Sequence, residues 1–285
     1  MPHLFDKIAI AGVGLIGGSL ALAARAKGLA GEIVGFGRKE PNLRFARDRG
    51  IIDSYSLDAR EAASGADLLF LSVPVGSMGA VTATCAPVLR RDAVVTDAGS
   101  VKAAVVHDIE AALPGGIAFV GAHPIAGGEQ AGAAAARPDL FAGNPCIITS
   151  SARSTPAAVH KIRALWEAVG MKVVEMDPEA HDALLARVSH LPHVLAFALI
   201  DAVRGRSEAV AKLAGTSFRD LTRIAASPTD VWSDIFVANR GELTTAIDEF
   251  SFALDELRDA IRSGDHAALR ALIERARQVR AKISG

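Results

Sequence analysis

A glycine-rich turn between a predicted strand and a predicted helix opens the chain, and it constrains the fold more than any other feature. Apolar residues 8–11 lead into Gly12-Val13-Gly14-Leu15-Ile16-Gly17, and an alanine-rich helix is predicted over residues 20–26. In such a unit the first glycine allows the tight turn, the second lets the backbone approach a pyrophosphate, and the third lets the helix pack on the strand. Phosphates then rest on the helix N-terminus, where free N–H groups and the macrodipole favour an anion. The pattern predicts a dinucleotide site that includes Gly12, Gly14, Leu15, Ile16 and Gly17.

Short apolar, β-branched runs alternate with longer helix-like segments through residues 1–177. Near-continuous apolar strands separated by helices indicate a parallel sheet covered on both faces. The sequence therefore predicts an α/β fold with an N-terminal Rossmann-type parallel sheet domain. The expected strands are Lys7–Ala11, Glu32–Phe36, Asp67–Val73, Ala93–Thr96, Ala118–Gly121, Cys146–Thr149 and Lys172–Glu175.

Glycine is distributed unevenly along the chain and marks a change of architecture. Of the 26 glycines, 21 lie in residues 1–177 and 5 in residues 178–285. From Pro178 onward the strand-like runs stop and the apolar spacing becomes helical. We therefore predict a dinucleotide-binding domain over residues 1–177 and an all-helical domain for substrate binding and dimerisation over residues 178–285.

The helical part contains one long amphipathic segment. Apolar positions spaced alternately by four and three predict a single helix that begins after Ser227-Pro228 and ends at Ser263-Gly264. A helix of about 35 residues is too long for a domain of this size to cover, so we expect it to pack against a second copy of the chain. A hairpin with the helix predicted over residues 265–283 is the alternative cover for part of the stripe. The stripe consists of Leu243, Ile247, Phe250, Leu254, Leu257 and Ile261.

The nearly balanced charge narrows the classes of partner. The chain has 31 Lys and Arg against 32 Asp and Glu, a formal charge of −1, so it has no broad basic field for nucleic acid or an anionic membrane. No uninterrupted apolar run reaches the roughly 18 residues of a membrane span, and the first residues lack a signal-peptide pattern. Cys85 and Cys146 are far apart without CxxC spacing, which argues against a disulfide framework. We expect a cytoplasmic protein with a small-molecule substrate.

The second predicted strand ends about 20 residues past the glycine motif, where the cofactor's ribose is recognised. NAD sites usually carry Asp or Glu there, but this chain has Gly37, followed by Arg38 and Lys39. A guanidinium binds a 2′-phosphate through two parallel N–H groups. NADP is therefore favoured; in the NAD alternative, Arg38 stacks on the adenine and Lys39 is solvated. Val73 and Pro74, at the end of the third predicted strand, complete the expected cofactor site.

Groups suited to proton transfer follow two of the predicted strands. His123 lies at the carboxyl end of its strand, where open α/β sheets bind ligands. Ser100 follows the preceding strand, as the N-cap of the next helix, as a hydroxyl facing the site, or as both. His190 and His193 share one helix face through their i, i+3 spacing. A zinc site is one reading of these histidines, but no acidic or cysteine ligand cluster accompanies them, so we expect no metal.

These segments resemble, in order and spacing, the motifs of the prephenate and arogenate dehydrogenases of tyrosine biosynthesis. The resemblance implies an N-terminal Rossmann domain, an all-helical C-terminal dimerisation domain, and a site between them. It also implies oxidative decarboxylation of prephenate, arogenate or both, with NADP or NAD, to 4-hydroxyphenylpyruvate or tyrosine and CO2. The matching segments are Gly12–Ser19, Asp97–Lys102, Gly121–Glu129, Ser189–His193 and Phe218–Ala225.

The resemblance also suggests roles for individual residues. His123 would accept the proton of the substrate's C4 hydroxyl, with Ser100 orienting that hydroxyl or His123. Arg223 would pair with the ring carboxylate; its alternative is a surface ion pair with a nearby Asp. The remaining substrate-binding residues are expected to be His193, His190, Ser189, Glu129 and Trp232, with Glu129 alternatively a solvated carboxylate and Trp232 contributed by the partner subunit.

Two other functions compete with this one. A dehydrogenase of the β-hydroxyacid type shares the domain plan, but its helical domain usually supplies a catalytic Lys. Here Lys212 and Lys282, the lysines after Pro178, sit in no matching motif. A sensor that binds NADP without chemistry would need neither His123 nor Arg223. The choice between prephenate and arogenate stays open.

Overall fold

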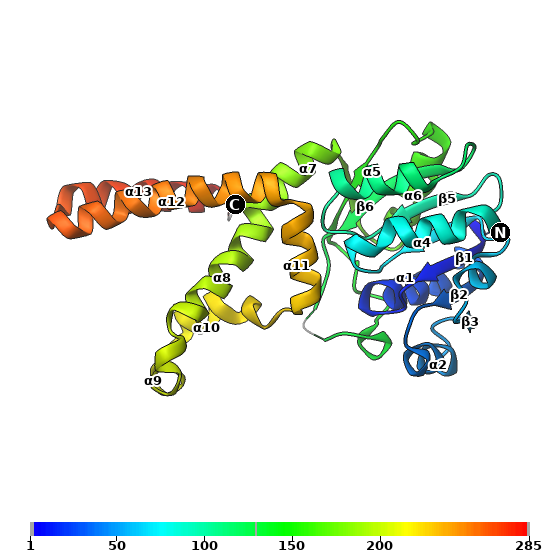
Figure 1. Cartoon of the computed structure of the whole chain (residues 1–285), viewed down its shortest axis with the longest axis horizontal. Helices are drawn as coiled ribbons and strands as arrows, with labels where there is room; N and C mark the ends of the chain where they lie inside the picture. The colour runs from blue at the N-terminus through cyan, green and yellow to red at the C-terminus, as the bar shows by residue number, and fades with distance from the viewer. Residues whose placement is uncertain (1–2, 129, 284–285) are drawn as a thin grey trace. The chain divides into compact units, whose positions relative to one another are not determined.

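The computed structural model describes residues 3–128 and 130–283, and over these residues the strands form one eight-stranded sheet in the order β3-β2-β1-β4-β5-β6-β7-β8 (Figure 1). The predicted α/β class with a Rossmann-type sheet is confirmed. The short strand β3 was not expected, because its polar residues give no apolar run. The strands are β1 (Phe5–Ala11), β2 (Ala30–Phe36), β3 (Ser54–Ser56), β4 (Leu68–Leu71), β5 (Val94–Asp97), β6 (Ala118–Pro124), β7 (Pro145–Thr149) and β8 (Lys172–Glu175).

One strand pair departs from the predicted all-parallel arrangement. β6 and β7 pair antiparallel, with His123 opposite Ile147, whereas the other neighbouring strands pair parallel. Parallel neighbours need a long crossover, usually a helix. The described residues between β6 and β7 form only the 3₁₀ turn η3 (Ala133–Ala135), so the chain returns beside β6 in the opposite direction.

The sheet is buried on both faces. Successive residues of a strand point to opposite faces, and the two core clusters divide them accordingly: Ile8 and Ile10 pack on one side, Ala9 and Ala11 on the other. Helices α1, α2 and α6 cover the first face, and α3, α4 and α5 cover the second (Figure 1). These helices are α1 (Leu15–Ala26), α2 (Glu40–Asp48), α3 (Ala59–Ala63), α4 (Met78–Cys85), α5 (Ala103–Ala112) and α6 (Pro156–Ala168).

A π-helical turn interrupts the first long helix after the sheet. Helix α7 (Pro178–Leu185) runs into the π turn η4 (Ala186–His190) and then into α8 (Leu191–Ala202). Pro192 has no N–H to donate to the carbonyl one turn earlier, which explains why the regular ladder breaks here. The following elements are α9 (Ser207–Leu213), α10 (Thr216–Thr222), the 3₁₀ turn η6 (Arg223–Ala226) and α11 (Thr229–Ala238).

The predicted single helix from Pro228 to Ser263 is wrong, because the chain forms two helices separated at Asn239. The Asn239 side-chain amide donates to the Asp182 carbonyl at 2.9 Å and contacts His190 Nδ1 at 3.0 Å. The backbone at Asn239 leaves the helical region, with φ −107° and ψ 27°. These contacts hold the end of α11 against α7 and η4 and so end the helix.

Residues 1–239 and residues 240–285 form two compact units. The second unit is a helical hairpin of α12 (Arg240–Ser263) and α13 (His266–Ile283), in which Arg275 pairs with Glu256 at 2.8 Å. Leu254 and Ile261 of the apolar stripe remain 51% and 65% exposed, so the hairpin covers only part of it. The domain boundary predicted at residues 177/178 stays a prediction.

Candidate active site

The three motif glycines occupy different environments: Gly12 and Gly14 lie in the turn between β1 and α1, and Gly17 lies in the first turn of α1. Gly12 has φ +86°, and a Cβ atom there would lie 2.6 Å from the Ser72 carbonyl oxygen. A Cβ atom on Gly17 would lie 2.3 Å from the Gly12 carbonyl oxygen. By contrast, a Cβ atom on Gly14 would meet nothing within 4 Å. The backbone is therefore tightly packed at Gly12 and Gly17 but open at Gly14, where a ligand can approach the N-terminus of α1.

A cavity of about 660 Å³ opens beside this turn. Six of the predicted cofactor residues line the cavity. The other three lie in the first turn of α1, where Gly17 is buried and Leu15 and Ile16 are half-buried. The cavity's size, the open backbone at Gly14 and the free helix N-terminus fit a dinucleotide. The six lining residues are Gly12, Gly14, Arg38, Lys39, Val73 and Pro74.

The rim of the cavity after β2 is basic. Gly37 directly follows this strand, and Arg38 and Lys39 come next with exposed side chains. Among the described residues, those lining the cavity include no Asp or Glu. A carboxylate that would repel a 2′-phosphate is therefore absent from this lining.

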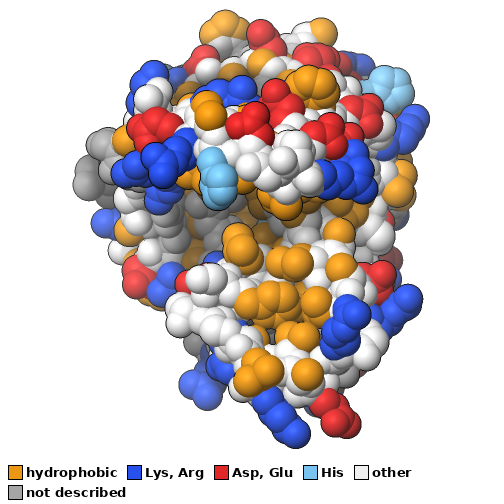
Figure 2. Space-filling model, turned by 90° about the vertical axis from the view of Figure 1, so that its left-hand side faces the viewer, with side chains coloured by type: hydrophobic (Ala, Val, Ile, Leu, Met, Phe, Trp, Pro, Cys, Tyr) orange, Lys and Arg blue, Asp and Glu red, His pale blue; other side chains and the backbone are white. Residues whose placement is uncertain are grey.

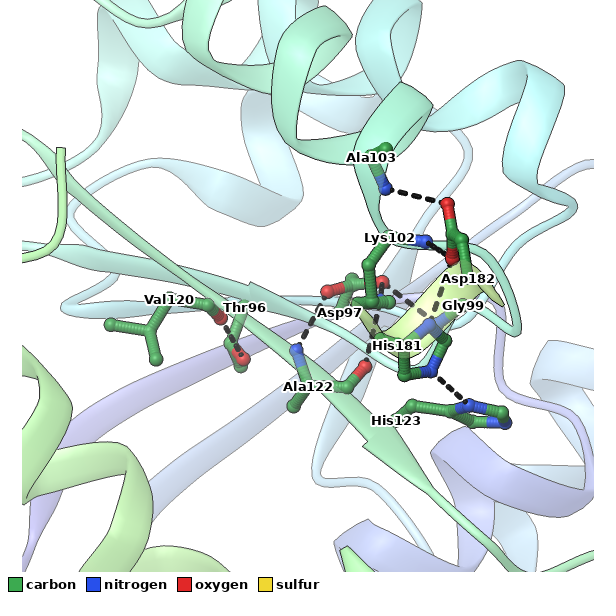
Figure 3. A network of polar contacts seen from close by, with 10 residues as sticks. All are labelled: Thr96, Asp97, Gly99, Lys102, Ala103, Val120, Ala122, His123, His181 and Asp182. Carbon is green, nitrogen blue, oxygen red and sulfur yellow. Dashed lines mark hydrogen bonds and ion pairs between the residues drawn. The ribbon is translucent and has the colours of Figure 1, made fainter. Parts of the chain in front are cut away.

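A buried ion pair lies where β5 and β6 end (Figure 3). Asp97 and Lys102, both with no exposed side-chain surface, form an ion pair across the loop that follows β5. Asp97 Oδ1 accepts the Ala122 N–H at 3.0 Å, and Lys102 Nζ donates to the Ala122 carbonyl at 2.9 Å. The pair therefore holds the residue before His123 through both of its backbone polar groups.

His123 ends a hydrogen-bonded chain that begins at a carboxylate (Figure 3). Asp182 Oδ1 lies 2.8 Å from His181 Nδ1, and His181 Nε2 lies 2.8 Å from His123 Nδ1. Asp182 also accepts the backbone N–H groups of Lys102 at 2.7 Å and Ala103 at 2.9 Å. Helix α7 thus contacts the start of α5 and the end of β6 through two adjacent side chains.

The direction of these hydrogen bonds fixes which nitrogen of each neutral ring carries the proton. A carboxylate that takes two backbone N–H groups acts as an acceptor, so His181 donates to Asp182 from Nδ1. His181 Nε2 is then the acceptor for the Nδ1–H of His123. His123 Nε2 is left with a lone pair, which a general base requires.

Burial keeps His123 neutral. Desolvation lowers its pKa well below the usual 6.5, and electrostatic interactions with His181, Lys102 and His190 lower it further. Burial also lowers the pKa of His181, although its hydrogen bond to Asp182 acts in the opposite direction. The pair is therefore uncharged at neutral pH and able to take up a proton.

Sequence reasoning missed His181 and Asp182. They lie in the middle of α7, and 58 positions separate His181 from His123. A His-Asp pair just after a predicted domain boundary was the available signal. Only the packing of α7 on the sheet reveals its partner.

His190 and His193 both lie against Trp232 of α11. The two ring centroids are 6.1 Å and 3.4 Å from that of Trp232, and His193 is stacked on the indole at 22°. His190 is fully buried, which lowers its pKa to about 4. His193 Nδ1 donates to the Ser189 carbonyl at 3.0 Å, leaving Nε2 as an acceptor when the ring is neutral. Trp232 thus contacts a histidine of its own chain, and its contribution to a partner's site stays a prediction.

The other expected site residues are placed less closely. Arg223 is exposed in η6, which packs on α8, and its charge adds to burial in lowering the pKa of His193. Ser100 is half-buried in the loop after β5. Glu129 lies outside the described residues. Over the part of the chain that the structure describes, no group of three His, Cys, Asp or Glu side chains is placed to hold a metal.

The glycine turn, the adjoining cavity and the neutral histidine at a strand end define a dehydrogenase that uses a nicotinamide cofactor. The chain belongs to the prephenate dehydrogenase family. Models of that family match it over residues 20–175, as the nucleotide-binding domain, and over residues 177–275, as the dimerization domain. This membership disfavours the β-hydroxyacid alternative.

Individual relatives agree along nearly the whole chain. The cyclohexadienyl dehydrogenase of Zymomonas mobilis is 38% identical over 270 residues, which are 92% of this chain and 90% of that protein. The prephenate dehydrogenase of Bacillus subtilis is 32% identical over 93% of this chain and 72% of its own length. The crystal structure of the prephenate dehydrogenase of Aquifex aeolicus, with hydroxyphenyl propionate and NAD+, has a TM-score of 0.92, 34% identity and 98% coverage of both chains. The crystal structure of the Synechocystis arogenate dehydrogenase has a TM-score of 0.82 and 28% identity, and the match covers 97% of this chain and 99% of that chain.

Proposed function

We propose that this chain oxidises and decarboxylates prephenate, arogenate or both, in the pathway to tyrosine. The observation that carries the proposal is the Asp182–His181–His123 chain, which presents an unprotonated imidazole nitrogen at the end of β6. The family relatives are named for these substrates, and the chain's own residues supply the base that such a reaction needs.

The reaction requires that a proton, a hydride and CO2 leave the substrate together. His123 Nε2 takes the proton of the C4 hydroxyl, and Ser100 orients that hydroxyl. A bound nicotinamide would accept the hydride from C4. As the C4–O bond becomes a carbonyl, the bond between the ring and its carboxylate breaks and CO2 departs. The electron pair of that bond passes through the ring to the C4 oxygen, and the phenolate that results takes the proton back from His123 to become a phenol. His181 and Asp182 stabilise the imidazolium that forms on His123.

The substrate's carboxylates require cationic or donor partners. We assign the ring carboxylate to Arg223 and the side chain of the substrate to His193, with His190 and Ser189 shaping this wall of the site. Helix α11 packs against η1 (Val75–Ser77), directly after Val73 and Pro74, so the wall that carries Trp232 reaches the edge of the cofactor cavity.

Replacing Arg223 with Ala is expected to raise KM for the substrate about 10–100-fold, since a hydrogen-bonded charge is lost. KM for the cofactor should stay unchanged. Steady-state kinetics over a range of substrate concentrations measures both. An unchanged substrate KM would place the carboxylate elsewhere, and Arg219→Ala, one turn earlier on α10, is the matched control.

NADP is the cofactor that we propose, with NAD as the alternative. Replacing Arg38 with Ala is expected to lower kcat/KM for NADP about 10-fold and to leave that for NAD nearly unchanged, because only NADP carries the 2′-phosphate. Measuring both cofactors with wild type and variant decides the point. A wild-type preference for NAD would contradict the assignment.

The proposed reaction is tested by incubating the protein with prephenate and then with arogenate, each with NADP and with NAD. The absorbance of the reduced nicotinamide and the released CO2 should rise together in a one-to-one ratio. Reduction of the cofactor without CO2 would indicate another dehydrogenase, and neither product would leave a binding function alone.

We also propose that the chain is a cytoplasmic homodimer. Apolar side chains gather on the lower part of the face shown in Figure 2. One continuous helical stretch of the described chain, Pro178–Ala202, is long and apolar enough to cross a membrane, and 22% of its most apolar window is buried. The same stretch carries the buried His181, Asp182 and His190. We therefore propose that one face of this helical stretch packs in the core of a soluble protein and that its other face forms a subunit interface. The exposed apolar residues of α8, α9 and α10 include Leu199, Ile200, Leu213 and Leu221.

A further inference from the structure

The Lys102–Asp97 pair lies beside the last residues of β6, beyond the point where the pairing of β6 with β5 ends. Strands β5 and β6 pair only as far as Thr96 and Val120, because the chain turns away after Asp97. The backbone N–H and carbonyl of Ala122 are nevertheless hydrogen-bonded on this side, to the Asp97 carboxylate and the Lys102 ammonium. The two side chains thus continue the ladder for one further residue, immediately before His123.

Stability alone does not account for such a pair. Removing two charges from water costs several kcal/mol per ion, and apolar replacements of buried ion pairs are often neutral or stabilising. Asp97 also accepts the Gly99 N–H at 2.8 Å, so the pair shapes the loop that carries Ser100 as well. The contacts of the pair thus reach the residue before His123 and the residue before Ser100.

We propose that Lys102 and Asp97 are positioning residues for His123: they fix the backbone before it and hold an ammonium group, paired with a carboxylate, beside the imidazole pair. This inference rests on the proposed role of His123 as the base. The charged and titratable groups that act on His123 are His181 from α7, His190 from η4 and Lys102 from the loop after β5. Asp182 in turn contacts His181, and Asp97, the last residue of β5, pairs with Lys102.

The cation favours the form of the base that the reaction needs. The positive charge of Lys102 is one of the causes that lower the pKa of His123 and of His181, after burial itself. Without it, His123 would gain a proton at a higher pH and lose its function as a base over a wider range. A neutral residue in this place would hold Ala122 less well and leave the imidazole easier to protonate.

The test compares the single variant Lys102→Met with the double variant Asp97→Asn/Lys102→Met. The single variant leaves the Asp97 carboxylate buried without its partner, which can unfold the protein. The double variant leaves no unpaired charge and so keeps the test valid if the single variant does not fold. Both are expected to lower kcat about 10-fold, to leave KM for the cofactor unchanged, and to move the acid limb of kcat/KM to higher pH. Lys161→Met is the matched control. It breaks an ion pair with Asp67 at the opposite ends of the strands and should keep the wild-type profile.

A second readout does not depend on turnover. In protein labelled with 15N-histidine, NMR titration of His123 should show protonation at a higher pH in both variants than in wild type. A folded double variant with wild-type kcat and a wild-type His123 titration would overturn the inference. If wild type turns over neither prephenate nor arogenate, the proposed function fails, while the titration still tests the pair.

Discussion

Replacing His123 with Asn is expected to lower kcat by about 10²–10⁴-fold, the usual contribution of a general base. Asn is close in size and keeps a side-chain amide near His181, but it cannot accept the hydroxyl proton. Cofactor binding should be preserved, because the dinucleotide cavity is built from other residues. The measurement is steady-state kinetics with the cofactor KM determined separately.

The pH profile sharpens this test. Since the pKa of His123 is well below 6.5, the neutral base persists in mildly acidic solution and the wild-type acid limb of kcat/KM should lie below pH 6.5. The residual activity of His123→Asn should lack that limb. His160→Asn, on the exposed face of α6, is the control and should behave as wild type. Wild-type turnover in His123→Asn would remove this residue from the mechanism.

Local sequence rules were sufficient where one segment fixes its own structure. The glycine turn could be assigned because strand, turn and helix follow one another without a gap, and Gly12 and Gly17 are indeed too crowded for a side chain. The apolar runs predicted the longer strands in the same way. Strand β3, with its polar sequence Ser54-Tyr55-Ser56, has no such signal, and only its pairing with β2 makes it a strand.

The sequence was insufficient where distant segments decide the outcome. The apolar spacing continues through Asn239, so periodicity predicts one helix, but contacts from Asn239 to α7 and η4 end α11 there. His181 and Lys102 were overlooked for the same reason. Lys102 ends the motif segment Asp97–Lys102 and His181 lies in no motif. Neither residue was assigned a role, because each acquires its partners from the packing of α7 and β6 around the end of β5.

Replacing Asp182 with Asn is expected to lower kcat about 10²–10³-fold, less than the roughly 10⁴-fold loss when an Asp that directly orients a catalytic histidine is changed in serine proteases. Three N–H groups converge on this carboxylate, from Lys102, Ala103 and His181. An amide keeps one acceptor oxygen and turns an NH2 group toward a donor. It also removes the negative charge that stabilises the imidazolium of the transition state. Kinetics and the 15N spectrum of His123, which reports the proton on Nδ1, measure both effects.

Asp182 also caps helix α5, because it accepts the N–H groups of Lys102 and Ala103 at the start of that helix. The effect of losing this cap must be separated from the effect of losing the hydrogen bond to His181. Asp58 offers the matched control, because its Oδ1 accepts the N–H groups of Arg60 and Glu61 at the start of α3, far along the sheet from His123. Asp58→Asn should lower the melting temperature by an amount similar to Asp182→Asn but leave kcat and the acid limb unchanged. Equal losses of kcat in the two variants would mean that Asp182 acts only as a structural helix cap. A loss confined to Asp182→Asn, with His123 less often protonated on Nδ1, means that the carboxylate acts through His181 on the base.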